Sequence, residues 1–167
     1  MPATHSRALM LALLVGGCTV PAVDHEAVRH EIDEQLQIGA EATRTEDIAA
    51  YMDGLPADFV IYDESGEVIS REQQRTNILR DWAVIPETID IEVGIDSLGV
   101  SGDSVATVYT WQRWLRTMLR PDRPGHDTVL TTQRHRETWR PTPDGWRLYE
   151  VDELGGRIWV NGDPYTP

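Results

Sequence analysis

Lysine is absent from this sequence, and acidic residues far outnumber basic ones. All 15 basic residues are arginine, against 28 aspartates and glutamates, so the formal net charge is −13 at pH 7. A surface of this sign repels the phosphate backbone of nucleic acids. We therefore expect no nucleic-acid partner, and we attach no function to the missing lysine because arginine replaces it throughout.

Long apolar runs are also missing. The longest obvious one, Ala8 to Val15, follows a leader with a single positive charge, Arg7. Eight residues are too few to cross a bilayer as a permanent helix, but they fit the apolar core of a cleaved export signal. The sequence therefore predicts a signal peptide over residues 1–17.

Cysteine occurs once, at Cys18, which excludes an internal disulfide. The run Val15-Gly16-Gly17-Cys18 resembles a bacterial lipobox, in which the cysteine is acylated and becomes the first residue of the mature chain. We expect an extracytoplasmic protein held on a membrane only by a lipid on Cys18, with residues 18–23 as a tether. The alternative is an ordinary signal peptide with an incidental cysteine.

The rest of the chain is rich enough in apolar residues to fold. Its 167 residues are 40% hydrophobic and include six tryptophans, which suits one domain with a substantial core. We assign this domain to residues 24–154. Residues 155–167 contain three glycines and two prolines, and we expect a C-terminal tail, either loose or laid across the domain.

Two helices are expected first. Asp24 is a suitable N-cap, and an apolar stripe at four-residue spacing predicts a helix to about Thr43. The stripe consists of Val28, Ile32, Leu36 and Gly39. Thr45 is expected to cap a second, short helix that ends before Gly54.

The apolar period then changes to two. Phe59, Ile61 and Asp63 share one face of a predicted strand, and Glu67 to Ile69 would return beside it as a second. Ser70 and Gln73 form the pattern of a capping box, which predicts a third helix. Its buried side would contain Ile78, Leu79 and Trp82.

Four β-rich segments make up the remainder. They cover residues 88–100, 104–119, 128–140 and 146–154, and turn residues separate them. Helices first and a long antiparallel sheet second indicate an α+β fold.

Two local motifs within this order are similar to a known superfamily. The stretch from Ala57 to Asp63, and the hairpin from Glu137 to Leu148, resemble the SnoaL-like and ketosteroid-isomerase-like branch of the nuclear transport factor 2 superfamily. The resemblance covers about residues 24 to 154. It implies a cone-like curved antiparallel sheet wrapped around the N-terminal helices, with a pocket at the open end. Such folds host isomerases, dehydratases, cyclases, carriers and proteins without chemistry, so the fold alone does not choose a function.

The last hairpin is predicted to bring ionisable groups together. Arginines alternate along one face of its first strand and favour water, so Trp139 should point inward. If Pro141 to Asp144 form the loop, Trp139 lies opposite Trp146 and His135 opposite Glu150. The inward face would then hold the ionisable residues His135, Glu137, Glu150 and Asp152, beyond an apolar floor of Trp139, Trp146 and Leu148.

Such a group is suited to acid–base chemistry. Dehydrated carboxylates that repel one another hold protons more tightly, and His135 would share a proton with Glu150. The resemblance implies that Asp63 stands where the isomerases have their proton-abstracting aspartate, and Glu137 where an acid donates a hydrogen bond to the oxyanion. The candidate catalytic residues are therefore Asp63, His135 and Glu137. The first helix has Gln37 to Gly39 where the isomerases keep a tyrosine, so steroid isomerisation is not carried over.

Purely structural roles remain open for the same residues. His135 and Glu150 would also make an ordinary cross-strand ion pair, and Asp63 would then merely start the turn at Glu64. A metal site of one histidine and several carboxylates lacks a tight ligand motif, since His25 and His30 are five residues apart. We expect no metal and no cofactor.

Three functions follow as hypotheses. The first is binding of a small hydrophobic or amphipathic molecule. Its expected contacts are Trp139, Trp146, Leu148, Glu150, Asp152, Tyr109 and Trp111. The second is an acid–base enzyme of the isomerase or dehydratase type. The third is a non-catalytic interaction module of the cell envelope, in which aromatic residues on the outer face of the sheet make a homodimer or bind a partner.

Overall fold

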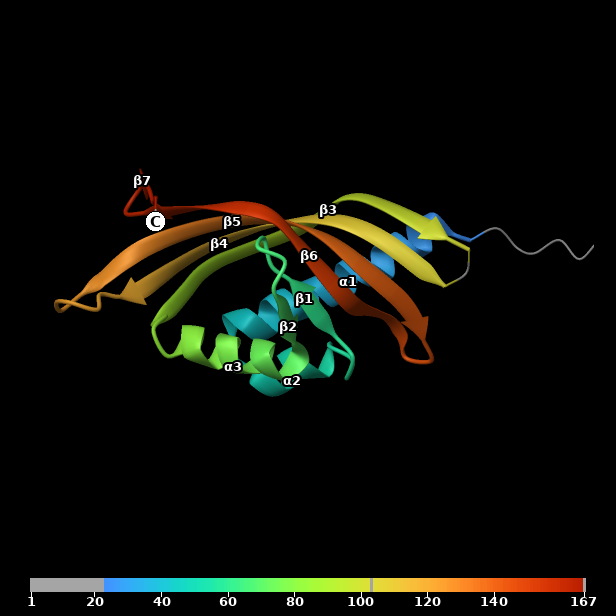
Figure 1. Cartoon of the computed structure of the whole chain (residues 1–167), viewed down its shortest axis with the longest axis horizontal. Helices are drawn as coiled ribbons and strands as arrows, with labels where there is room; N and C mark the ends of the chain where they lie inside the picture. Colours follow the sequence, from blue (N-terminus) through green and yellow to red (C-terminus); the bar gives the residue numbers. More distant parts are fainter. Residues whose placement is uncertain (1–22, 103, 167) are drawn as a thin grey trace, which may run out of the picture.

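The computed structural model describes residues 23–102 and 104–166 (Figure 1). The signal peptide, the lipidation site Cys18 and most of the tether lie outside these residues. The described elements, in chain order, are α1 (His25–Arg44), α2 (Ile48–Asp53), β1 (Val60–Tyr62), β2 (Val68–Ser70), α3 (Arg71–Trp82), β3 (Glu87–Ser101), β4 (Val105–Leu119), β5 (His126–Thr142), β6 (Gly145–Val160) and β7 (Asp163–Pro164). Among them, no helix has both the length and the apolar character needed to cross a membrane.

Helix α1 follows the sequence prediction. The Asp24 carboxylate accepts hydrogen bonds from the backbone N–H groups of Glu26 and Ala27, which satisfies donors left free by the first turn. The stripe at four-residue spacing is buried, and Ile32 is fully covered. Helix α1 lies against the concave face of the sheet (Figure 1).

Helix α2 has a different cap from the one expected. The Asp47 carboxylate accepts from Ala49 and Ala50, whereas the Thr45 hydroxyl donates back to the carbonyl of Glu41 and closes α1. The prediction of Thr45 as the N-cap of α2 was wrong. The loop between the helices contains two residues able to cap, and Thr45, which is nearer to α1, caps the C-terminus of α1.

Helix α3 begins with the predicted capping box of Ser70 and Gln73. The side of α3 that we expected to be buried is not: no residue of the helix is fully buried, and Leu79 is 38% exposed. The helix lies at the open side of the sheet, below β3 and β4 (Figure 1). There it borders a cavity instead of packing into a core.

The strands form one curved, unclosed sheet in the order β2-β1-β6-β5-β4-β3. Most neighbours are antiparallel, as expected, but β1 pairs with β6 in parallel. The sheet is therefore mixed and not wholly antiparallel. The parallel pair arises because β1 enters at the free edge of β6, on the side away from β5, and runs in the same direction as β6.

Strand β6 continues beyond the predicted domain end at residue 154. It pairs with β5 as far as Val160 opposite Val129, and Trp159 lies opposite Leu130. The expectation of a tail from residue 155 was wrong, because Gly155 and Gly156 pass through the strand instead of ending it. The short β7 then folds back on β6.

The hydrophobic core consists of two separate clusters. The larger joins α1 to β3, β4 and the hairpin of β5 and β6, and it contains Trp139 and Trp146. The smaller consists of Phe59, Ile61 and Val151, where β1 meets β6. The partly buried Leu148 contacts both clusters.

Candidate functional site

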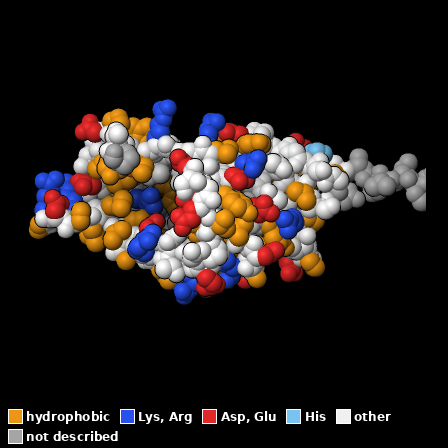
Figure 2. Space-filling model, in the orientation of Figure 1, with side chains coloured by type: hydrophobic (Ala, Val, Ile, Leu, Met, Phe, Trp, Pro, Cys, Tyr) orange, Lys and Arg blue, Asp and Glu red, His pale blue; other side chains and the backbone are white. Residues whose placement is uncertain are grey.

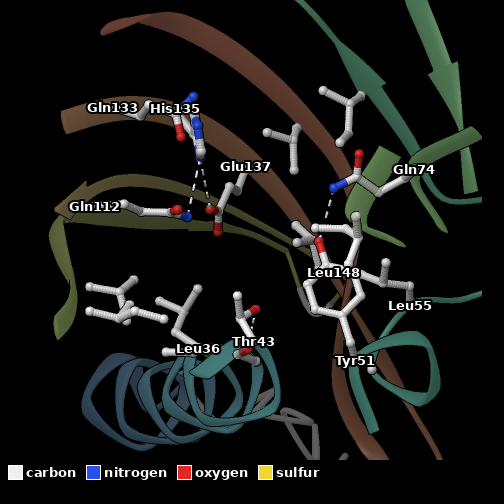
Figure 3. Close-up of a pocket in the computed structure, with 18 of the residues that line it drawn as sticks. Leu36, Thr43, Tyr51, Leu55, Gln74, Gln112, Gln133, His135, Glu137 and Leu148 are labelled. Atoms are coloured by element: carbon white, nitrogen blue, oxygen red, sulfur yellow. Dashed lines mark hydrogen bonds and ion pairs between the residues drawn. The ribbon is translucent and has the colours of Figure 1, made fainter. Parts of the chain in front are cut away.

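A cavity of about 400 Å³ lies between the helices and the concave face of the sheet (Figure 3). Its walls come from all three helices and from β1 to β6. Apolar side chains such as Leu36, Phe59 and Val93 line much of it. A pocket of this size, mainly apolar with a few polar groups, is typical of small-molecule sites.

A buried carboxylate, Glu137, lies among the residues that line the cavity. Its side chain is 1% exposed, and each carboxylate oxygen accepts one hydrogen bond. Thr110 Oγ1 donates to Oε1 at 2.8 Å, and Trp139 Nε1 donates to Oε2 at 2.8 Å. Both donors are neutral, and His135 Nδ1 lies 3.9 Å from Oε1, too far for a hydrogen bond. Burial of this carboxylate therefore costs free energy.

A hydrogen-bonded chain beside Glu137 fixes the state of His135. The indole N–H of Trp114 can only donate, and it donates to Gln112 Oε1 at 3.0 Å. Gln112 therefore turns its NH₂ group toward His135 Nδ1, 3.4 Å away. Nδ1 must accept this bond, so the neutral ring carries its proton on Nε2.

The other ring nitrogen of His135 has no partner among the described residues. Nε2 is buried and makes no hydrogen bond. Glu153 lies opposite His135 on β6 and also lines the cavity. Burial raises the pKa of the Glu153 carboxyl, and the nearby His135 partly offsets that rise. The two ionisable groups lie opposite each other in the wall of the cavity, with no direct hydrogen bond between them.

The opposite wall carries a second polar pair. Gln74 of α3 donates to the hydroxyl of Tyr51 of α2 at 3.0 Å, which leaves the hydroxyl proton free to donate (Figure 3). Burial raises the pKa of Tyr51. The hydroxyl therefore stays protonated and can act as a hydrogen-bond donor at neutral pH.

Glu150 and Asp152 do not reach the cavity, which corrects the prediction. They lie on the outer face, where Glu150 accepts from Arg140 at 2.9 Å and Asp152 accepts from Arg136 at 3.0 Å. The cause is a bulge in β6: Trp139 pairs with Leu148, but Thr138 pairs with Glu150. One extra residue exchanges the two faces of a strand beyond it.

The turn of the hairpin is also shorter than predicted. Thr142 pairs with Gly145, so Trp139 lies opposite Leu148 instead of Trp146. This two-residue slip keeps the faces, and both tryptophans are buried. Trp139 and Leu148 line the cavity, whereas Trp146 lies in the larger core cluster and outside the cavity lining.

Asp63 has the structural role of the alternative interpretation. It follows the last residue of β1, and its Oδ1 accepts from the backbone of Ser65 at 2.9 Å and of Glu67 at 2.8 Å. Hydrogen bonds, chiefly from the Ser65 hydroxyl, lower the pKa of Asp63. The side chain does not line the cavity, so its prediction as a catalytic base was wrong in position.

Tyr109 and Trp111 are likewise outside the cavity. Thr110, between them, points inward and is fully buried, so both aromatic residues lie on the outer face. Tyr109 is 41% exposed, and the Trp111 ring packs over Gly94. The inward aromatic residue of β4 is Trp114.

Sequence reasoning missed several residues of the site. Gln112 and Trp114 follow Thr110 at a period of two, so fixing one inward residue of β4 would have found both. Glu153 could not be found in this way, because the bulge in β6 exchanges the faces. Tyr51 was placed on a helix, but nothing local indicates which way it points.

Comparison with solved structures identifies the fold. The chain covers 97% of LinA with a TM-score of 0.67, 12% identity and 86% of its own length. An NTF2-like protein from Cytophaga hutchinsonii gives a TM-score of 0.57 at 13% identity, covering 78% of this chain and 98% of that one. The chain has the nuclear transport factor 2-like fold. No protein-family model and no curated protein matches the sequence.

A putative scytalone dehydratase from Novosphingobium aromaticivorans has the same fold. It gives a TM-score of 0.64 at 8% identity, covering 76% of this chain and 84% of that one. Structural similarity at such low sequence identity establishes the fold but does not establish an activity. The fold and the open cavity together support either a small-molecule-binding domain or an acid–base enzyme.

No cluster of three or more histidine, cysteine, aspartate or glutamate side chains in the described residues has the geometry of a metal site. Glu137, His135 and Tyr51 of the cavity are bonded to amides, a hydroxyl and an indole. These partners suit the orientation of an organic molecule or the movement of a proton.

Proposed function

We propose that this domain binds a small, largely apolar molecule in the cavity. The apolar walls would bury the body of the molecule. Amide side chains supply hydrogen bonds that orient its oxygen atoms. Those that line the cavity are Gln35, Gln74, Asn77, Gln112 and Gln133.

One observation carries this proposal: the cavity stays open where the domain would otherwise have a continuous core. Protein interiors are close-packed, and large voids forfeit many van der Waals contacts. Here about 400 Å³ between the helices and the sheet is unfilled, beside two separate hydrophobic clusters. A bound molecule would supply the missing contacts.

The direct test is to fill the cavity. Gly39 of α1 lines it, and a Cβ at this position would meet nothing within 4 Å. Gly39→Leu should fold normally and place its side chain in the space. We expect the fluorescent, uncharged probe N-phenyl-1-naphthylamine to bind the unmodified protein, and Gly39→Leu to weaken binding by about tenfold or more.

The matched control is Gly99→Leu. Gly99 is exposed on β3, does not line the cavity, and also has no atom within 4 Å of an added Cβ. This variant should bind the probe as the unmodified protein does. Equal binding by both leucine variants would remove the cavity from the proposal.

A second candidate function is an acid–base enzyme, and the pair of His135 and Glu153 favours it. Burial raises the pKa of Glu153, so this carboxyl holds its proton more tightly than usual. Such a group can donate a proton that an ordinary, ionised carboxylate lacks. In a screen of isomerisation and dehydration substrates, Glu153→Gln should abolish turnover but retain substrate binding. Unchanged turnover in this variant would exclude the role of Glu153.

We also propose that the domain is displayed on a bacterial membrane by a lipid on Cys18. The support is the sequence alone: an apolar run of eight residues before Gly16-Gly17-Cys18. Cys18→Ser should release the protein from the membrane fraction and remove the acyl mass from its N-terminus. Membrane attachment that persists in this variant would contradict the lipid anchor.

A further inference from the structure

The guanidinium of Arg116 lies in the wall of the cavity, far along the sheet from Glu137. Arg116 lines the cavity from β4. It is opposite Val129 of β5, whereas Thr110, six positions earlier on β4, is opposite His135. At about 3.3 Å per residue, Arg116 and the His135 pair are about 20 Å apart along the strands. The cavity is therefore elongated, with different charges along it.

The guanidinium of Arg116 is poorly satisfied by the described residues. Its Nε is buried without a partner, and its one hydrogen bond is a long one of 3.4 Å from Nη2 to Thr131 Oγ1. The group stacks over Trp114 at 5.4 Å. No carboxylate of the described residues lies within 4.0 Å of it. Asp81 acts on the group only at longer range. A partly buried charge that is so weakly paired costs free energy that a bound anion would offset.

The charges around Arg116 favour an anion at this end. Asp81 and Arg80 of α3 also line it, and they lie 4.0 Å from each other. Two arginines and one aspartate therefore lie at this end, whereas the ionisable groups at the other end are His135 and the carboxyl groups of Glu137 and Glu153. Figure 2 shows arginine side chains at a hollow between α3 and the sheet.

We infer that Arg116 binds the carboxylate of an elongated amphipathic acid whose apolar body lies along the cavity toward His135. This inference rests on the proposed binding function. A planar guanidinium matches a planar carboxylate and forms strong charge-assisted hydrogen bonds with it. The wall between the two ends is apolar and includes Ile78, Ile91 and Val93. An acid bound the other way round would place its charge beside Glu137 and Glu153.

The experiment compares an acid with an alcohol of the same chain. Dodecanoic acid and dodecan-1-ol compete for the cavity against N-phenyl-1-naphthylamine, which carries no charge and so reports cavity binding independently of Arg116. Arg116→Gln should weaken displacement by the acid by about tenfold or more. Displacement by the alcohol, and binding of the probe itself, should not change.

Two further variants complete the design. Arg113→Gln is the matched control, because Arg113 lies on the outer face of the same strand and bonds Asp90 at 2.9 Å; it should leave all three affinities unchanged. Asp81→Asn removes the competing carboxylate and should tighten binding of the acid several-fold without affecting the alcohol.

The outcomes separate this inference from the proposed function. Unchanged affinity for the acid in Arg116→Gln, with the probe still bound, would overturn the role of Arg116 and leave the cavity as a binding site. Absence of probe binding to the unmodified protein would overturn both. If Arg116→Gln does not fold, Asp81→Asn decides, and an unchanged affinity for the acid in that variant would overturn the inference.

Discussion

At the scale of single residues, Glu137 is the side chain whose position is hardest to explain by stability alone. It is almost fully buried, and both of its hydrogen-bond donors are neutral. An apolar residue would avoid the cost of burying a carboxylate. Its place at the cavity is consistent with the proposal that this wall orients a ligand.

Two substitutions of Glu137 should show how much its hydrogen bonds contribute to the stability of the fold. Glu137→Gln keeps an acceptor for Trp139, and the Thr110 hydroxyl can rotate to accept from the new amide, so the free energy of unfolding should change by less than about 1 kcal/mol. Glu137→Leu leaves both partners unsatisfied and should cost about 2–4 kcal/mol. Urea denaturation measures both. Equal losses would contradict the hydrogen-bonding account.

Glu153 predicts a dependence of stability on pH. Burial raises its pKa above the ordinary value of 4.5 in the folded protein. A raised pKa means that its contribution to stability is fully present below about pH 4.5 and is lost as the pH rises through the folded value. Glu153→Gln should therefore be more stable than the unmodified protein at about pH 7 and not at about pH 4.

The control for this prediction is Glu150→Gln. Glu150 lies on the outer face beside Arg140, so its loss should not raise stability at neutral pH. Unfolding curves for both variants over this pH range test the difference. A gain at about pH 7 in both variants would point to relief of the overall negative charge instead.

At the scale of elements, Gly156 is a position where β6 passes very close to the neighbouring strand β5. A Cβ on Gly156 would lie 2.5 Å from the backbone oxygen of Thr132, and that oxygen cannot move without shifting β5. Gly156→Ala should therefore lower the free energy of unfolding by about 1–3 kcal/mol.

Gly99→Ala provides the matched comparison for Gly156→Ala. It adds the same methyl group to β3, where nothing lies within 4 Å. It should leave stability unchanged or raise it by up to about 1 kcal/mol, because alanine loses less backbone entropy on folding than glycine. Thermal or urea unfolding of the two variants measures this difference in stability. A neutral Gly156→Ala would mean that the strands separate more easily than their pairing indicates.

Elements with strong local signals could be predicted from the sequence. Helix α1, its cap at Asp24 and the capping box of α3 are local patterns, and the structure has them where they were expected. Strand pairing is not local. The bulge at Tyr149 has no signal in the sequence, and it alone moved Glu150 and Asp152 to the outer face and brought Glu153 inward.

The candidate site was only partly predictable for the same reason. His135, Glu137, Trp139 and Leu148 line the cavity because they lie at inward positions around the hairpin, before the bulge changes the faces. Arg116 continues the inward positions of Thr110, Gln112 and Trp114 on β4. Tyr51 and Gln74 come from helices whose place around the cavity depends on the whole fold. No spacing in the sequence connects them to His135.

At the scale of the whole molecule, two surfaces are candidates for the functional site. One is the cavity, with its apolar walls and fixed polar groups. The other is the outer face of the sheet, where Tyr109 is 41% exposed. An interaction module or a homodimer would use the second surface, and this remains a prediction from the sequence.

The most direct test of the central claim is a map of amide chemical shifts by NMR as N-phenyl-1-naphthylamine is added. The account predicts that shifts concentrate on residues that line the cavity, such as Leu36, Tyr51 and His135. Amides around the exposed Tyr109 on the outer face should shift little. Shifts confined to the outer face, or no shifts at all, would contradict the assignment of the cavity as the functional site.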